Sequence, residues 1–175
     1  PYLTREFGNP SSHHTVGEAA ASVLVDARRR VAAVLGMRPG DVVFTSGGTE
    51  ANNLAVKGVA IADLLRRGRP GSIVTTPIEH ESILASCDHL ARLHGVDVVR
   101  VPVDARGRLD PDAVARALRD DTALVTFGYA NNEVGTVQDV AAIAAVARER
   151  GIPVHVDAVQ AAGWLPLAGL GVDAI

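Results

Sequence analysis

The chain places hydrophobic residues at two kinds of spacing, which predict helices and strands in alternation. From Val16 to Leu35 the apolar residues recur at helical spacing, and Gly36 ends the predicted helix. The same spacing predicts helices over residues 51–67, 81–94, from 111 onward and over 140–150. Short continuous apolar runs predict strands over residues 41–45, 72–76, 96–101, 123–129 and 153–157.

This alternation predicts the fold class α/β, with a mostly parallel sheet flanked by helices. The strand-like runs are apolar throughout rather than alternating, as expected for strands that are buried on both faces. Residues 1–15 are rich in glycine, asparagine, proline and serine, and they predict an irregular N-terminal arm. One domain is then expected over residues 16–175.

The composition excludes several classes of protein. Hydrophobic residues make up 47% of the 175 residues, which excludes a disordered chain. The net charge is -3 and no basic tract stands out, so we expect no nucleic acid partner. No apolar run reaches about 18 residues, so we expect no membrane span. The single cysteine, Cys87, excludes an intramolecular disulfide and indicates a reducing compartment, which predicts a cytoplasmic location.

Polar residues follow four of the predicted strands, at the edge where ligands bind in parallel sheets. We expect these residues to lie close together because the carboxyl ends of parallel strands share one edge. They are the segment Ser46–Glu50, the pair Glu79 and His80, the segment Asn131–Glu133, and Asp157 with Gln160.

The segment Ser46–Glu50 is a glycine-containing turn before a predicted helix. Gly47 and Gly48 allow the backbone to approach a ligand closely, and the free N–H groups of a helix N-terminus attract an anion such as phosphate. The alternative is an ordinary turn in which Thr49 caps the helix. The segment matches neither a P-loop nor a dinucleotide-binding fingerprint.

His80 lies between two carboxylates, Glu79 and Glu81, at the start of a predicted helix. Its imidazole could stack on an aromatic ligand or transfer a proton near neutral pH. The alternative is a surface histidine that caps the helix. The sequence alone leaves both interpretations open.

His155 and Asp157 share one face of a predicted strand. Two such groups could bind a metal, but no third ligand has suitable spacing, so we expect no metal site. Asp157 is a better candidate to hold a protonated ring nitrogen, and Gln160 could reach the same ligand. For His155 we favour a hydrogen-bonded core residue.

The remaining candidates are two asparagines, the single cysteine and the single lysine. The amides of Asn131 and Asn132 would need partners if buried, but asparagine also favours turns. Cys87 occupies an apolar helix position and is interpreted as a core residue. The single lysine, Lys57, is interpreted as a solvated side chain on a helix.

Five segments together resemble the cysteine desulfurases, the NifS/IscS-like branch of the class V aminotransferases. They occur in the order found in that family and extend over nearly the whole chain. The segments are GNPSSHHTVG (8–17), FTSGGTEANNLAVKG (44–58), IEHESIL (78–84), YANNEVGTVQD (129–139) and HVDAVQAAG (155–163).

The resemblance implies the cofactor pyridoxal 5'-phosphate (PLP), a fold type I large domain that is incomplete over residues 16–175, and a homodimer. It implies L-cysteine as substrate, L-alanine as product, and sulfur that passes through an enzyme persulfide to acceptor proteins. Those acceptors serve iron–sulfur cluster assembly, tRNA thiolation or cofactor synthesis.

The resemblance also assigns roles to residues of this chain. Gly48 and Thr49 match the phosphate-binding turn, and His80 matches the histidine that stacks on the pyridine ring and assists proton transfer. These positions agree with the helix N-terminus and imidazole chemistry considered above.

Three more residues match cofactor contacts of the family. Asp157 matches the carboxylate that pairs with the pyridine nitrogen, so that the ring can accept electrons. Gln160 matches the residue near the phenolic oxygen of the cofactor. Asn132 matches a residue close to both cofactor and substrate.

Two functional residues of the family, a lysine and a cysteine, have no match in this chain. The lysine that binds PLP covalently and the catalytic cysteine loop are expected beyond Gln160, and neither Lys57 nor Cys87 matches them. We therefore expect this chain alone to be inactive. Alternatives are another class V enzyme, such as a selenocysteine lyase or a C–S lyase, or a non-catalytic homologue that serves as a scaffold.

Overall fold

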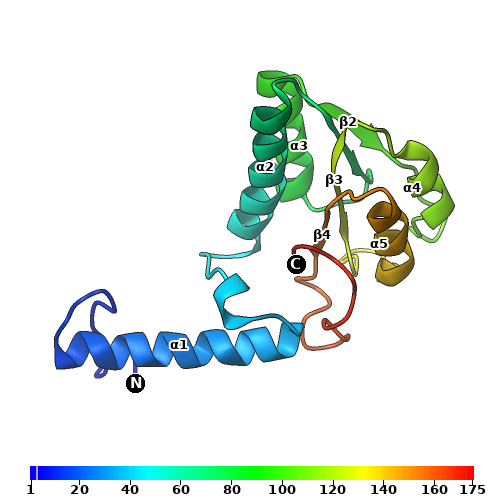
Figure 1. Cartoon of the computed structure of the whole chain (residues 1–175). Coiled ribbons are helices and arrows are strands. Elements are labelled where there is room, and N and C mark those ends of the chain that lie inside the picture. The colour runs from blue at the N-terminus through cyan, green and yellow to red at the C-terminus, as the bar shows by residue number, and fades with distance from the viewer. Residues whose placement is uncertain (3) are drawn as a thin grey trace. The chain divides into compact units, whose positions relative to one another are not determined.

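The computed structural model describes residues 1–2 and 4–175, which divide into two compact units (Figure 1). The first unit comprises residues 1–44 and 167–169, and the second comprises residues 45–166 and 170–175. The expected arm over residues 1–15 and domain over residues 16–175 stay predictions.

The first unit is built on one long helix, α1 (Thr15–Leu35). The His14 side chain caps its start by accepting the Gly17 N–H, and Gly36 ends it in the left-handed conformation, with φ of 66°. A short 3-10 helix, η1 (Pro39–Asp41), follows.

The strand predicted over residues 41–45 does not form. Its apolar residues satisfy the pattern of a strand, but no neighbouring strand pairs with them in the part of the chain that the structure describes. The Arg28 guanidinium instead donates to the Val42 carbonyl and lies 4.8 Å from the centre of the Phe44 ring. Val43 and Phe44 remain 65% and 45% exposed, so side-chain contacts rather than backbone pairing hold this segment.

The second unit is an α/β domain whose four parallel strands lie in the order β2-β1-β3-β4, which confirms the predicted fold class. The strands are β1 (Ser72–Thr75), β2 (Asp97–Arg100), β3 (Thr122–Gly128) and β4 (Val154–Asp157). The helices are α2 (Gly48–Arg67), α3 (Glu81–His94), α4 (Pro111–Ala117) and α5 (Val140–Glu149). Figure 1 shows α2 and α3 on one side of the sheet and α4 and α5 on the other.

The core lies on both faces of the two central strands, β1 and β3, whose residues are nearly all buried. Val56 of α2 and Ile83 of α3 pack with Ile73 of β1 on one face. Cys87 belongs to the same cluster and is fully buried, and this burial raises the pKa of its thiol to about 12. The prediction of a core cysteine is therefore confirmed.

His155 is likewise a core residue, as predicted. Its Nδ1 lies 2.8 Å from the Thr126 hydroxyl, and burial lowers the pKa of the imidazole to about 4. Within residues 1–2 and 4–175, no cluster of three or more histidine, cysteine or acidic side chains could hold a metal ion. None of the described helices is both long enough and apolar enough to cross a membrane.

The second unit also offers a test of an observed helix cap, at the start of α5. The Asp139 carboxylate accepts the Ala142 N–H at 3.1 Å at the start of α5. We expect Asp139→Ala to lower the free energy of unfolding by about 1 kcal/mol, as measured by urea titration. Asp139→Asn should retain most of that stability because an asparagine oxygen also caps. An equal loss in both variants would contradict the role of the cap.

Candidate cofactor site

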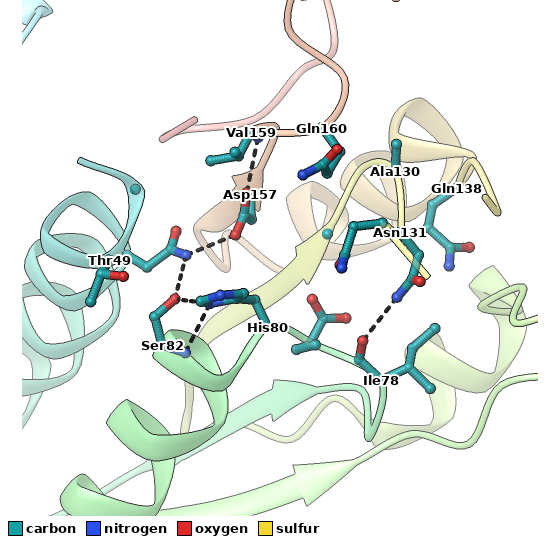
Figure 2. A pocket seen from close by; sticks show the side chains of 15 residues that line it. Thr49, Ile78, His80, Ser82, Ala130, Asn131, Gln138, Asp157, Val159 and Gln160 are labelled. Atoms are coloured by element: carbon teal, nitrogen blue, oxygen red, sulfur yellow. Dashed lines mark hydrogen bonds between the residues drawn. The ribbon is translucent and has the colours of Figure 1, made fainter. Parts of the chain in front are cut away.

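A cavity of about 310 Å³ lies at the carboxyl ends of the strands in the second unit, beside the start of α2. Figure 2 shows side chains from several elements pointing into it. All six residues that the sequence singled out line this cavity. They are Gly48, Thr49, His80, Asn132, Asp157 and Gln160.

The N-terminus of α2 supplies the backbone N–H groups at one end of the cavity. Gly47 is the N-cap residue and offers no side chain to these groups, so the N–H groups of the first turn remain available to an anion. Thr49 lies inside the helix, so the alternative in which Thr49 caps α2 is wrong. A Cβ atom on Gly48 would lie 2.8 Å from Cγ2 of Val159, which explains why a glycine is needed at this edge of the cavity.

His80 caps a helix, as one of the two interpretations predicted, and stacking on a ligand or proton transfer stays a prediction. It is the N-cap residue of α3, and its Nδ1 accepts the backbone N–H of Ser82 at 3.1 Å. The Ser82 hydroxyl lies 2.7 Å from the same nitrogen. The imidazole also lines the cavity (Figure 2), so capping fixes the ring at the place where a ligand would meet it.

Asp157 lies at the end of β4, where it pairs in register with Gly128 of β3. One carboxylate oxygen accepts the Val159 N–H at 3.0 Å, and the other accepts the side-chain amide of Asn52 at 2.8 Å. These two contacts orient the carboxylate and leave lone pairs free for a third donor from the cavity.

Glu79 brings a second carboxyl group into the cavity. Burial raises the pKa of the Glu79 carboxyl to about 7. The hydrogen bonds that the carboxyl accepts from the Thr76 hydroxyl and the Gly128 N–H lower this pKa, and the negative charge of the nearby Asp157 raises it. A Cβ atom on Gly128 would lie 3.2 Å from this carboxyl, so only glycine leaves room for it without a shift.

The two asparagines after β3 have different functions. The Asn131 Oδ1 accepts the N–H groups of Glu133 and Val134, and its Nδ2 donates to the Ile78 carbonyl at 3.1 Å. Asn131 is therefore the turn residue that the sequence allowed. Asn132 is exposed at the cavity and is the one that could contact a ligand.

Sequence reasoning missed Asn52 and Ser82, and it assigned no role to Glu79, although all three line the cavity. Two signals could have found Asn52 and Ser82. Asn52 lies four residues after Gly48, on the same face of α2, and Ser82 lies where the backbone of a first helical turn meets its cap.

A family model described as "Aminotransferase class-V" matches residues 1–175, the whole chain. The chain belongs to the class V aminotransferase family. The cavity beside the parallel sheet is lined mostly by residues of the segments that resemble this family.

Curated relatives of this class V chain are cysteine desulfurases. The chain is 42% identical to the cysteine desulfurase IscS of Dictyoglomus turgidum and 47% identical to a cysteine desulfurase of Cereibacter sphaeroides, with 99% of the chain aligned in each case. It spans only 43% and 44% of the lengths of these two relatives.

Solved structures agree with the sequence comparisons. The chain superposes on SspA in complex with cysteine with a TM-score of 0.93 at 37% identity, and on a NifS-like protein with a TM-score of 0.92 at 39% identity. Each match covers 99% of the chain, but 49% and 48% of the respective structures. The class V fold of the chain is thus shared over its whole length.

Proposed function

We propose that the protein to which this chain belongs is a PLP-dependent cysteine desulfurase. It converts L-cysteine to L-alanine and transfers the sulfur through a persulfide to acceptor proteins. The observation that carries the proposal is that the N-terminus of α2, the His80 imidazole and the Asp157 carboxylate line one cavity. The similarity to cysteine desulfurases, and to a structure solved with cysteine, supports this choice of substrate.

The residues of the cavity fit PLP by their chemistry. The free N–H groups at Gly48 and Thr49 suit its phosphate, and the carboxylate of Asp157 suits its protonated ring nitrogen. The cavity volume lies at the lower end of the range of about 300–1,000 Å³ that is common for small-molecule sites.

PLP, when bound, supplies an electron sink for bonds that break next to the amino group of the substrate. In our proposal Asp157 would keep the ring nitrogen protonated, and His80 would cover the ring and assist proton transfer. Gln160 would lie near the phenolic oxygen of PLP, and Asn132 would lie close to both PLP and the substrate. Cys87 is not the sulfur acceptor, because it is fully buried and its thiol has a pKa of about 12. Lys57 does not line the cavity, so a lysine for PLP would come from another part of the protein.

The proposal includes the assembly and the location that accompany this activity. We infer a homodimer, acceptor proteins for sulfur and a cytoplasmic site of action. One unpaired cysteine in the core agrees with a reducing compartment.

The activity is tested directly on the full protein loaded with PLP. With L-cysteine and a thiol reductant, we expect alanine and sulfide in equal amounts, measured by amino-acid analysis and by a colorimetric sulfide assay. Selenocysteine and other sulfur amino acids should react more slowly. Turnover of selenocysteine alone would indicate a selenocysteine lyase, and no turnover of any of them would indicate a scaffold.

A further inference from the structure

We propose that Asn52 and Ser82 are positioning residues that hold the His80 imidazole in its neutral tautomer with the proton on Nε2. His80 then presents a hydrogen-bond donor to the cavity in its resting state. The tautomer follows from contacts within the chain, and only its use toward PLP rests on the proposed function.

The first step is the orientation of the Asn52 amide, which is buried with 4% of its surface exposed. Its Nδ2 lies 2.8 Å from a carboxylate oxygen of Asp157 and 2.9 Å from the hydroxyl of Ser82. A carboxylate oxygen can only accept, so the amide must turn its NH2 group toward Asp157. Both hydrogens of this group are then used, one on each partner.

The second step concerns the Ser82 hydroxyl, which has one hydrogen to donate. Because the oxygen accepts from Asn52, that hydrogen is free to point to His80 Nδ1, 2.7 Å away. The backbone N–H of Ser82 donates to the same nitrogen at 3.1 Å, and a backbone N–H can only donate, so the direction of this hydrogen bond is fixed. A nitrogen that accepts from two donors carries no proton.

The third step is the proton on the other side of the ring. A neutral imidazole has one N–H, so a deprotonated Nδ1 places it on Nε2. No residue among 1–2 and 4–175 forms a hydrogen bond with Nε2, while the ring lines the cavity (Figure 2). The cavity therefore receives an N–H donor, and resting His80 has no lone pair with which to act as a base there.

The same amide links the two groups expected to hold PLP. Asn52 donates to Asp157 at one hydrogen and, through Ser82, sets the direction of the hydrogen bond to His80 at the other. A change at Asn52 should therefore alter both groups, whereas a change at Ser82 should alter His80 alone.

The tautomer can be measured on the full protein freed of PLP, with 15N-labelled histidine and a His80→Gln variant for assignment. We expect the Nδ1 signal at the shift of an unprotonated nitrogen and the Nε2 signal at that of a protonated one. Ser82→Ala should shift the tautomer ratio about fivefold toward the Nδ1–H form, the size expected for one lost hydrogen bond. Asn52→Asp should act in the same direction, because the Ser82 hydroxyl then turns to the new carboxylate.

Ser86→Ala is the matched control. Ser86 is buried on α3 and donates to the Ser82 carbonyl, but it does not contact His80. This variant should leave both nitrogen signals unchanged. A proton on Nδ1 in the unmodified protein would overturn the proposal, and so would equal spectra for Ser82→Ala and Ser86→Ala. Because PLP is absent, these outcomes do not depend on whether the protein is a desulfurase.

Discussion

Asp157→Ala is expected to lower kcat/KM for L-cysteine in the PLP-loaded protein by about two to four orders of magnitude. In the proposed complex, the Asp157 carboxylate pairs with the pyridinium of PLP at the end of β4. Removing one partner of a buried ion pair costs about 3–5 kcal/mol, and each 1.36 kcal/mol changes a rate tenfold. The ring would lose its proton and, with it, the ability to accept electrons.

Two further variants separate charge from structure. Asp157→Asn keeps the shape of the side chain but removes its charge, so its rate should fall nearly as far. Asp173→Ala is a matched control, because the Asp173 carboxylate accepts the Val154 N–H at the opposite end of β4. Near-normal rates for Asp157→Ala, or recovery in Asp157→Asn, would contradict the pairing with a ring nitrogen.

Glu79→Gln is expected to change the pH dependence of stability in the PLP-free protein. The ordinary pKa of a glutamate is 4.5, and burial raises the pKa of Glu79 to about 7. Between about pH 4.5 and 7, Glu79 is therefore mostly protonated in the folded protein and mostly ionised in the unfolded chain. The unfolded chain binds fewer protons there, and stability from this group is lost as the pH rises from about 4.5 through 7. The full effect is about 3 kcal/mol.

His155 opposes this trend in the unmodified protein. Its pKa is lowered to about 4 from 6.5, so the unfolded chain binds more protons between these values and stability rises with pH. The two effects largely cancel between about pH 4.5 and 6.5. Glu79→Gln removes the pH-dependent loss of stability caused by Glu79 and leaves the effect of His155. Between pH 4 and 8, the free energy of unfolding of the variant should therefore rise by about 3 kcal/mol relative to that of the unmodified protein, measured by urea titration at each pH.

The control for this experiment is Glu81→Gln, two residues away on the exposed side of α3. The free energies of unfolding of Glu81→Gln and the unmodified protein should differ by the same amount at every pH. The interpretation of a buried Glu79 fails if Glu79→Gln also shows a constant difference. A constant offset alone would report only the altered contact with Gly128.

Local pattern predicted most elements of the fold because their stabilisation is local or follows from burial on both faces. Helix α3 begins and ends where the spacing of its apolar residues and Gly95 indicate. Helix α2 begins three residues before the expected start, because Gly47 rather than a polar side chain is its N-cap. The strand over residues 41–45 was wrong because pairing needs a neighbour that no local pattern can supply.

The sequence by itself determined the α/β class and the polar residues at the strand ends, since periodicity decides which side chains are buried and parallel strands share one edge. Only the tertiary structure decided how those side chains contact one another. Asn52 meets Ser82 across 30 residues and Asp157 across 105 residues of chain. The raised pKa of Glu79 likewise depends on burial against Gly128 and the nearby Asp157. Contacts and desolvation of this kind arise from packing between distant segments, and no short stretch of sequence encodes them.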